Sequence, residues 1–328
     1  MARTPWWLGV LGMLLALTAC SSMPRRTHAP QIDAARWRAG DGRVFPYERW
    51  PATTSAAPRH PKAILICHHG LSGAASDFWP LGELARSRGD WIVYSLQVRA
   101  QGNDPARSHR GDIAKATEWV RDMVEFSHLV RREHPGVPVY WVGESLGALV
   151  TIHASAAAPP AEAPDGVVLL SPPVELRQKL PALKSAAIRL LLAVVPWYRI
   201  DVERLGGDAV RNMQITAGTT HHQQMSQTSH HVKNFSLRLF GEIEHLIRHS
   251  QTDGIHLSRP LLVLYTAHDA LVTRESVERW FGKVGSADKT AAFFPESYHL
   301  ILHDKEREHA LKTIEHWLEQ RAGSHRVR

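Results

Sequence analysis

Residues 137–148, Val-Pro-Val-Tyr-Trp-Val-Gly-Glu-Ser-Leu-Gly-Ala, join two runs of different character. An apolar, β-branched run ends at Gly143, and a helix-forming run covers residues 146–158. Between them lies the pattern G-x-S-x-G, with Ser145 at its centre. This arrangement predicts a tight strand-to-helix turn that exposes the serine hydroxyl above a helix N-terminus, where developing negative charge is favoured. The pattern alone is weak, so an ordinary turn serine remains the alternative until the rest of the chain supplies partners.

Short apolar runs alternate with amphipathic helical patterns along the chain. We expect strands at residues 62–70, 91–96, 137–143, 166–172, 260–266 and 291–294. We expect helices at residues 76–88 with Ser76 as N-cap, 112–132, 146–158, 273–281 and 303–321. Residues 41–51 alternate loosely and indicate a hairpin or an edge strand, since Pro46 cannot donate to a neighbour. This order predicts an α/β fold, with a mostly parallel central sheet and helices on both faces.

A long insertion interrupts this alternation at residues 173–258, between two parts of the predicted core at 37–172 and 259–322. It contains an apolar run at residues 190–198 and a helical pattern at residues 232–248. Placed over the carboxyl ends of the strands, the insertion would form a helical cap or lid. Two interpretations of the apolar run stay open: it lines an acyl-chain pocket, or it packs against the core.

A nucleophilic serine needs a base within hydrogen-bond reach, and the base needs an orienting acid. Asp269 follows the expected strand that ends at Thr266, and His299 lies in the loop before the last helix. The order Ser145, Asp269, His299 is the one expected when all three lie beyond strand ends of an α/β sheet. The competing bases are His303 and His309, and the competing acids are Glu296 and Asp253.

With these motifs the chain resembles the α/β-hydrolases, in the branch of monoacylglycerol lipases, lysophospholipases and serine aminopeptidase-like enzymes. The resemblance spans residues 36–320. It rests on the following segments: Asp41-Gly42, Trp50-Pro51, His69-Gly70, the Ser145 turn, the Asp269 turn and Tyr298-His299. It implies an α/β-hydrolase fold with a helical cap and a catalytic triad of Ser145, Asp269 and His299. It further implies an oxyanion hole made by the backbone N–H groups of Leu71 and Leu146, and no cofactor.

The chain departs from this resemblance at residues 97–103. The family usually has an Asp-x-Arg-Gly-x-Gly-like run there, and this chain has Gln97 in place of the acid. The departure leaves the triad intact but affects the assignment of the subfamily and its substrate.

The first twenty residues have the pattern of a targeting segment. Arg3 precedes an apolar stretch at residues 6–18, which is short for a bilayer span, and Leu17-Thr18-Ala19-Cys20 follows. This resembles a bacterial lipobox, with residues 1–19 as signal peptide, Cys20 as the lipidated residue and residues 20–36 as a tether. By the same resemblance, Ser21 points to the outer membrane of the cell envelope, facing the periplasm. The alternative is an ordinary secretory signal with a chance cysteine.

The amino-acid composition argues against several other classes of protein. Hydrophobic residues make up 44% of the 328, enough for a large core, and only Cys20 and Cys67 could form a disulfide. The formal charge is +7, but no long basic block or nucleic-acid motif accompanies it. The pairs His221-His222 and His230-His231 lack acid or cysteine partners at metal-ligand spacing, so no metal is expected.

The sequence therefore predicts a serine hydrolase that cleaves carboxylic esters of lipid-like substrates through an acyl-enzyme. Its expected partners are a lipid or small ester substrate and the membrane that holds lipidated Cys20, without nucleic acid; no oligomeric state is indicated. The alternatives are a small-molecule carboxylesterase or peptidase, and a catalytically inactive hydrolase-fold protein that binds ligands in the envelope.

Overall fold

The computed structural model describes residues 25–51, 61–177, 188 and 190–322. The expected signal peptide, Cys20 and the first part of the tether lie outside the described residues. The central sheet has nine strands in the order β1-β2-β3-β5-β4-β6-β7-β12-β13. Pairing is parallel from β5 to β13 and antiparallel from β1 to β5. The strands are β1 Gln31–Ile32, β2 Arg36–Arg38, β3 Val44–Trp50, β4 Ala63–His68, β5 Trp91–Leu96, β6 Val139–Glu144, β7 Gly166–Leu170, β12 Leu261–Thr266 and β13 Lys289–Phe294.

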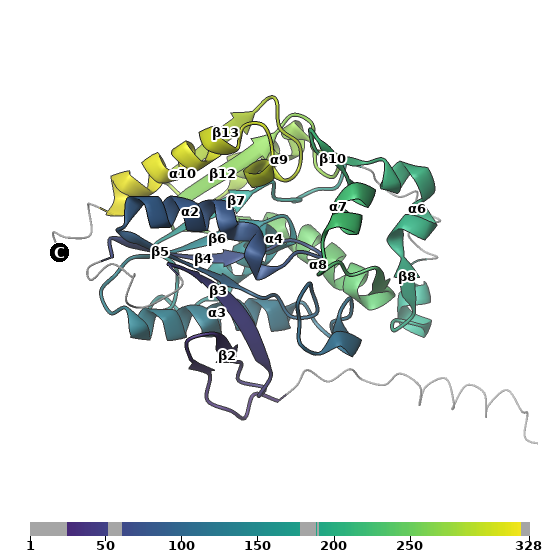
Figure 1. The fold of residues 1–328 in the computed structure, drawn as a ribbon, viewed down its shortest axis with the longest axis horizontal. Helices are drawn as coiled ribbons and strands as arrows, with labels where there is room; N and C mark the ends of the chain where they lie inside the picture. Colours follow the sequence, from purple (N-terminus) through teal and green to yellow (C-terminus); the bar gives the residue numbers. More distant parts are fainter. Residues whose placement is uncertain (1–24, 52–60, 178–187, 189, 323–328) are drawn as a thin grey trace, which may run out of the picture.

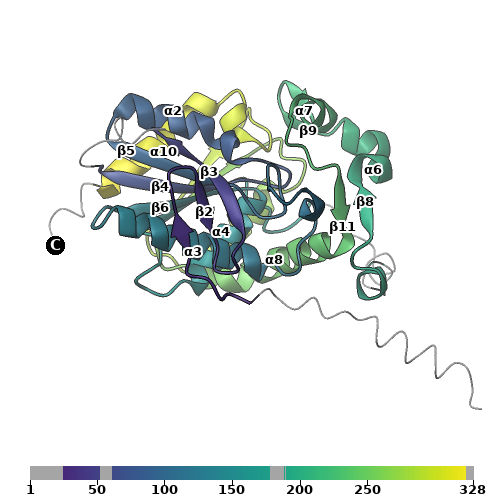
Figure 2. The same ribbon diagram turned by 60° about the horizontal axis from the view of Figure 1, so that its bottom comes forward.

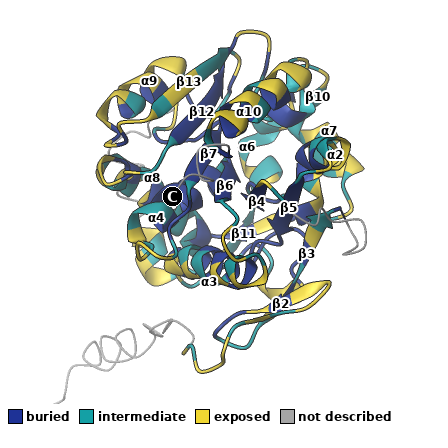
Figure 3. Cartoon of the chain, turned by 90° about the vertical axis from the view of Figure 1, so that its left-hand side faces the viewer, coloured by how far each residue is buried: buried dark blue, intermediate teal, exposed yellow. Residues whose placement is uncertain are grey.

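Helices cover both faces of this sheet, as the alternating sequence pattern predicts (Figure 1). The main helices are α2 Trp79–Arg88, α3 Thr117–Glu133, α4 Leu146–Ala157, α9 Arg274–Lys283 and α10 Arg307–Ala322. Helices α2 and α10 share one apolar cluster with the sheet, and α3, α4 and α9 contribute to the clusters on the opposite face. Every residue of β4, β5, β6, β7 and β12 is buried, which explains their near-continuous apolar sequences (Figure 3).

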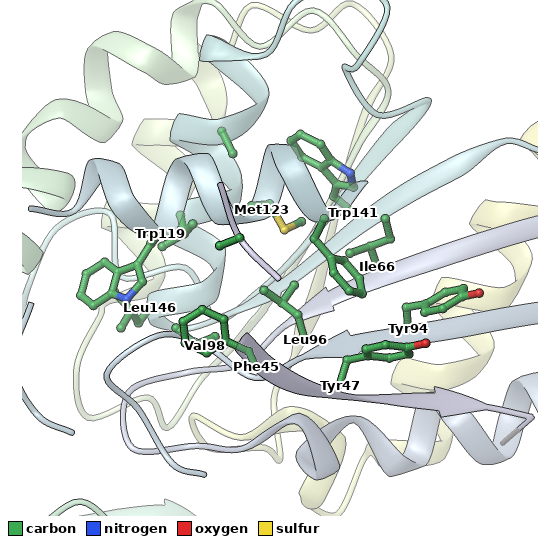
Figure 4. Close-up of a cluster of buried hydrophobic side chains, with 14 of the residues drawn as sticks. Phe45, Tyr47, Ile66, Tyr94, Leu96, Val98, Trp119, Met123, Trp141 and Leu146 are labelled. Carbon is green, nitrogen blue, oxygen red and sulfur yellow. The ribbon is translucent and has the colours of Figure 1, made fainter. Parts of the chain in front are cut away.

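The cluster under α3 and α4 is rich in aromatic side chains (Figure 4). The buried indole N–H of Trp141 donates to Ser127 Oγ at 2.9 Å, and that of Trp119 donates to the Arg99 carbonyl at 2.9 Å. Because both polar atoms have partners, these large side chains are buried without an unpaired donor. This packed core therefore fixes the positions of the strand ends that lead into the loops of the site.

Several expected boundaries differ from the structure. Ser76 lies inside a 3₁₀ turn, η2 Ala75–Phe78, and therefore does not cap α2. Helix α3 begins five residues later than expected, because the Asp112 carboxylate instead binds Ser236 and Arg238. Two further short 3₁₀ turns are η3 Arg107–His109 and η4 Ile301–His303, and the second delays the start of α10. Of the two alternatives for residues 41–51, the edge strand is wrong, since β3 pairs with both β2 and β5, whereas the antiparallel pairing of β3 with β2 agrees with the hairpin.

The insertion between β7 and β12 has two parts (Figures 1 and 2). Its elements are β8 Arg199–Asp201, α6 Val202–Arg211, β9 Gln214–Thr216, β10 Thr219–Thr220, α7 His221–Gln227, β11 Asn234–Ser236 and α8 Leu237–Ile255. Helix α8 packs against α4, where the ring of His153 bonds both Asp253 and the Leu246 carbonyl. Helices α6 and α7 instead contribute residues to a cavity that also contains Ser145. The division of the chain into core and cap at residues 173 and 258 stays a prediction.

The apolar run at residues 190–198 matches neither interpretation made from the sequence. Leu190, Trp197 and Tyr198 are each more than half exposed, and none of them lines the cavity. Leu192 lies near Gly241 of α8. Most of this run therefore presents apolar side chains to the outside of the insertion.

Candidate active site

The turn between β6 and α4 brings three backbone segments unusually close together. A Cβ on Gly147 would lie 1.8 Å from the His68 carbonyl oxygen, and one on Gly143 would lie 2.4 Å from the Gly147 carbonyl oxygen. Neither glycine has a positive φ, whereas Ser145 itself has φ of 54°. The glycines are thus required for close packing, and the strained backbone belongs to the serine, as is common at functional sites.

The structure brings Ser145, His299 and Asp269 together from three separate strand ends. Ser145 Oγ lies 2.8 Å from His299 Nε2, and His299 Nδ1 lies 2.7 Å from Asp269 Oδ2. The other Asp269 oxygen accepts the backbone N–H groups of Leu271 and Val272. Both His299 and Asp269 are buried, so this hydrogen-bonded chain is shielded from water. A histidine placed between a serine and an acid can act as a base toward the serine hydroxyl.

The competing candidates from the sequence do not join this hydrogen-bonded chain, although His303 also lines the cavity beside it. Asp253 bonds His153, and the backbone N–H of Glu296 bonds Glu306 on the outside of the loop. His303 packs near Trp79, and His309 packs against Phe294. None of these four is hydrogen-bonded to Ser145 or His299.

Burial and charge act in opposite directions on the titration of His299. Burial lowers the pKa of the ring, but the Asp269 carboxylate, with a smaller contribution from Glu144, raises it by more, so the pKa lies above its ordinary value. Glu144 precedes the serine, is buried, and has no hydrogen-bond partner for Oε1 among the described residues. Burial raises the pKa of Glu144 to about 7.

The residues expected to supply two backbone donors, Leu71 and Leu146, lie at the two segments that meet beside the serine. Gly70 is so close to the turn that a Cβ there would lie 3.2 Å from the Ser145 Cβ. Leu146 is the first residue of α4, where an N–H has no intrahelical acceptor. Within the described part of the chain, neither the Leu71 nor the Leu146 N–H donates to a protein acceptor. Both groups are therefore available to a ligand beside Ser145.

A cavity of about 780 Å³ lies above the serine. The insertion contributes apolar side chains to its lining, among them Val202, Val210, Met213, Ile215, Met225, Phe235 and Phe240. Polar groups also reach it: Asp77, Glu203, His221, His230 and His231. The cavity is large enough for a drug-sized or lipid-like molecule, with polar groups that can orient one end.

The paired histidines of the insertion have protein partners of their own. His221 and His222 lie against Glu203, His230 approaches Asp77 at 3.6 Å, and His231 is 3.2 Å from Ser72 Oγ. Across the residues that the structure describes, no three His, Cys, Asp or Glu side chains form a group suited to a metal ion. Among those same residues, no helix combines the length and apolar character needed to cross a bilayer.

The sequence assigned no role to the residues that support the site from behind, although it marked Gln97 as a departure from the family pattern. Gln97 and Gln101 are buried beside the turn at residues 70–75 and bond its backbone N–H groups. Asp304 accepts hydrogen bonds from the loop that carries His299 and from the insertion. Glutamine and aspartate at these positions have no local pattern, so only the spatial arrangement reveals them.

Comparison with known proteins places this geometry in a family. Residues 59–306 match the model of the serine aminopeptidase S33 family of hydrolases. The chain belongs to this family. The chain is 23% identical to the monoglyceride lipase of Rattus norvegicus, over 86% of this chain and 88% of that protein. It is 26% identical to a phospholipase of Bacillus subtilis, over 79% of this chain and 96% of that protein.

A solved structure supports the same fold. The monoglyceride lipase of Saccharomyces cerevisiae, in complex with a substrate analogue, superimposes with a TM-score of 0.73 at 16% identity. The match covers 92% of this chain and 98% of that one. The expected α/β-hydrolase fold, with its mostly parallel sheet, is therefore confirmed for this serine aminopeptidase S33 family member.

Proposed function

We propose that this protein is a serine hydrolase that cleaves carboxylic esters of lipid-like substrates. The observation that carries the proposal is the hydrogen-bonded chain Ser145–His299–Asp269 at the base of a cavity of about 780 Å³ with a largely apolar wall. The names of the relatives, monoglyceride lipase and phospholipase, support a lipid ester as the substrate class.

The proposed reaction passes through an acyl-enzyme. Ser145 Oγ attacks the ester carbonyl while His299 Nε2 takes its proton, and the Leu71 and Leu146 N–H groups stabilise the resulting oxyanion. His299 then gives the proton to the leaving alcohol, and Asp269 stabilises the charged ring in between. A water molecule, deprotonated by His299, hydrolyses the acyl-enzyme and restores Ser145. No metal or cofactor takes part in this scheme.

The substrate assignment follows from the lining of the cavity. Aliphatic, methionine and phenylalanine side chains from the insertion offer an apolar surface to an acyl chain, which gains about 0.8 kcal/mol for each CH₂ that it buries. The polar groups that also line the cavity, among them Asp77 of the core and His230 of the insertion, suit a hydroxyl-bearing leaving group. A monoacylglycerol or a lysophospholipid has both features.

An acyl-chain series on the purified protein tests this function. We expect kcat/KM for monoacylglycerols to rise with chain length from about four carbons, because each added CH₂ is buried. A fluorophosphonate probe should label the wild type, and Ser145→Ala should abolish both labelling and hydrolysis while the protein stays folded. Preference for the shortest esters would favour a small-molecule carboxylesterase, and faster cleavage of peptide amides a peptidase. Equal labelling of both proteins would refute the serine mechanism.

We further propose that the protein is attached to the bacterial envelope through lipidated Cys20. Its location would be the outer membrane, on the side that faces the periplasm. The apolar side chains exposed at residues 190–198 support a location beside lipid, since tryptophan and tyrosine favour membrane interfaces. Metabolic labelling with an alkynyl fatty acid should mark the wild type and not Cys20→Ser. A labelled Cys20→Ser protein, or an unlabelled wild type, would contradict the anchor.

A further inference from the structure

The turn at Gly70–Gly73 presents one peptide unit that matters for the proposed reaction. The Gly70 carbonyl accepts the Gly73 N–H at 3.1 Å, which closes a tight turn with Leu71 in its first central position. The Gly70 C=O and the Leu71 N–H belong to the same planar trans peptide and point in opposite directions. Whatever holds the Gly70 carbonyl therefore also aims the Leu71 N–H.

The His69 ring holds this carbonyl from inside the protein. His69 is fully buried, and its Nδ1 lies 2.9 Å from the Gly70 oxygen. For this contact to be a hydrogen bond, Nδ1 must carry the proton, because a carbonyl oxygen can only accept. The tautomer of His69 thus decides whether the turn is held.

The Gln97 side chain and the Val98 backbone N–H together settle which nitrogen of His69 is protonated. The Gln97 Nε2 lies 3.0 Å from the Gln101 carbonyl and 3.3 Å from the Val98 carbonyl, so this end of the amide is the NH₂ group. The same NH₂ lies 3.1 Å from His69 Nε2. The Val98 backbone N–H, which can only donate, also points at this nitrogen at 3.0 Å. With two donors directed at it, Nε2 accepts and the proton stays on Nδ1.

Electrostatics keep the ring in this state. Burial lowers the pKa of His69 to about 3, so it is neutral at physiological pH. A carboxylate at position 97 would have no hydrogen to donate and would face the Nε2 lone pair. The amide of Gln97 therefore complements a neutral, Nδ1-protonated His69.

We propose that Gln97 is a positioning residue for the oxyanion hole: together with the Val98 N–H it donates to His69 Nε2, and so it holds the ring where its Nδ1–H binds the Gly70 carbonyl and aims the Leu71 N–H at the site beside Ser145. The inference rests on the proposed serine hydrolase function. It also gives a role to the residue at which the sequence departs from the resemblance.

Kinetics of Gln97→Met test the proposal, because methionine has a similar length but no donor. We expect kcat to fall by about 10- to 100-fold, less than the roughly 10²- to 10³-fold loss when an oxyanion donor is removed outright. KM should change by less than about twofold, since the interaction is made in the transition state. The affinity for an alkylboronic acid, whose tetrahedral adduct places an oxygen in the same site, should fall in parallel with kcat.

A matched control separates positioning from loss of stability. Ser127→Ala removes a buried hydrogen bond from Trp141 in the same core and touches neither His69 nor Gln97 in the hydrogen bonds of the structure. It should lower the melting temperature to a similar extent and leave kcat unchanged. An equal loss of kcat in both variants, or an unchanged kcat in folded Gln97→Met, would overturn the proposal.

A double-mutant cycle tests whether Gln97 acts through His69. In a His69→Leu background, Gln97→Met should cause little further loss of kcat, because the ring that transmits its effect is gone. Additive losses would contradict the relay. If a variant does not fold, ¹⁵N NMR of the histidines in the wild-type protein tests the proposal instead. His69 should be protonated at Nδ1 and unprotonated at Nε2, and the opposite tautomer would refute the proposal.

These outcomes differ from a failure of the proposed function. If Ser145→Ala retains full hydrolysis, the serine mechanism fails. If hydrolysis depends on Ser145 but not on Gln97, only the present inference fails.

Discussion

The Asp304 carboxylate accepts the backbone N–H of Tyr298 at 2.7 Å, directly beside His299. Its other oxygen accepts the N–H of Ala217 at 2.9 Å, in the insertion next to β9. The Leu300 N–H also bonds the Ile215 carbonyl at 3.0 Å. The loop that carries His299 is therefore fastened to the wall of the cavity.

Replacement of Asp304 by asparagine should loosen this connection. An asparagine has one carbonyl oxygen, so it can accept from only one of the two N–H groups, and its NH₂ would face the other. We expect kcat/KM to fall by about tenfold, at the low end of the roughly 1–3 kcal/mol lost when a buried group is left unsatisfied, because both hydrogen bonds are only part-buried. Steady-state kinetics with a monoacylglycerol would measure this, with Lys305→Ala on the same loop as control. Unchanged kinetics would show that the His299 loop keeps its position without Asp304.

Asp269→Asn should impair the chemistry without removing the acceptor for the Leu271 and Val272 N–H groups. Its amide NH₂ would point at His299 Nδ1 and favour the tautomer with the proton on Nε2, facing Ser145. We expect kcat to fall on the order of 10⁴-fold, the loss characteristic of this change in Ser-His-Asp hydrolases. Fluorophosphonate labelling should slow accordingly. Labelling at the wild-type rate would mean that Asp269 does not orient the ring.

The wild-type pH–rate profile should reflect the raised pKa of His299. His299 must be neutral to accept the serine proton, and Asp269 stabilises its charged form. The acid limb of kcat/KM should therefore lie above pH 6.5, the ordinary histidine value. An acid limb clearly below that pH would place a different group in the role of base.

Glu144→Gln should stabilise the protein at alkaline pH. The native pKa of about 7 exceeds the ordinary 4.5, so the native state holds the proton more tightly and loses stability as the pH rises between those values. This shift corresponds to about 3 kcal/mol as an upper bound. Urea unfolding should show a gain for the variant at pH 8 and little change at pH 4. Glu308→Gln, at an exposed site, is the control, and the same gain at both pH values would argue against a charge effect.

The exposed apolar run offers a test of lipid contact. A Leu190→Glu, Trp197→Glu double variant places charges on side chains that do not line the cavity. We expect weaker sedimentation of the unlipidated protein with anionic vesicles, with turnover of a soluble short-chain ester unchanged. Equal vesicle binding by both proteins would exclude this run as a lipid-contacting surface.

The sequence by itself determined the layered architecture and three site residues. Uninterrupted apolar runs such as residues 261–266 are buried on both faces, so their pattern reports a parallel sheet directly. Ser145, Asp269 and His299 follow strand ends, and parallel strands bring their carboxyl ends to one edge. Local pattern and chain order were therefore sufficient to name residues that the structure brings into hydrogen-bond contact.

Tertiary structure alone decided the supporting contacts and the insertion. Gln97 contacts His69, 28 residues away along the chain, and Asp304 contacts Ala217, 87 residues away. No local periodicity in the sequence predicts such pairs. The run at residues 190–198 was expected to be covered, yet most of it is exposed. The apolar character of a segment does not reveal which part of the protein, if any, packs against it. The start of α3 also differs from the position expected from the sequence, because the Asp112 side chain binds Arg238, which is distant along the chain.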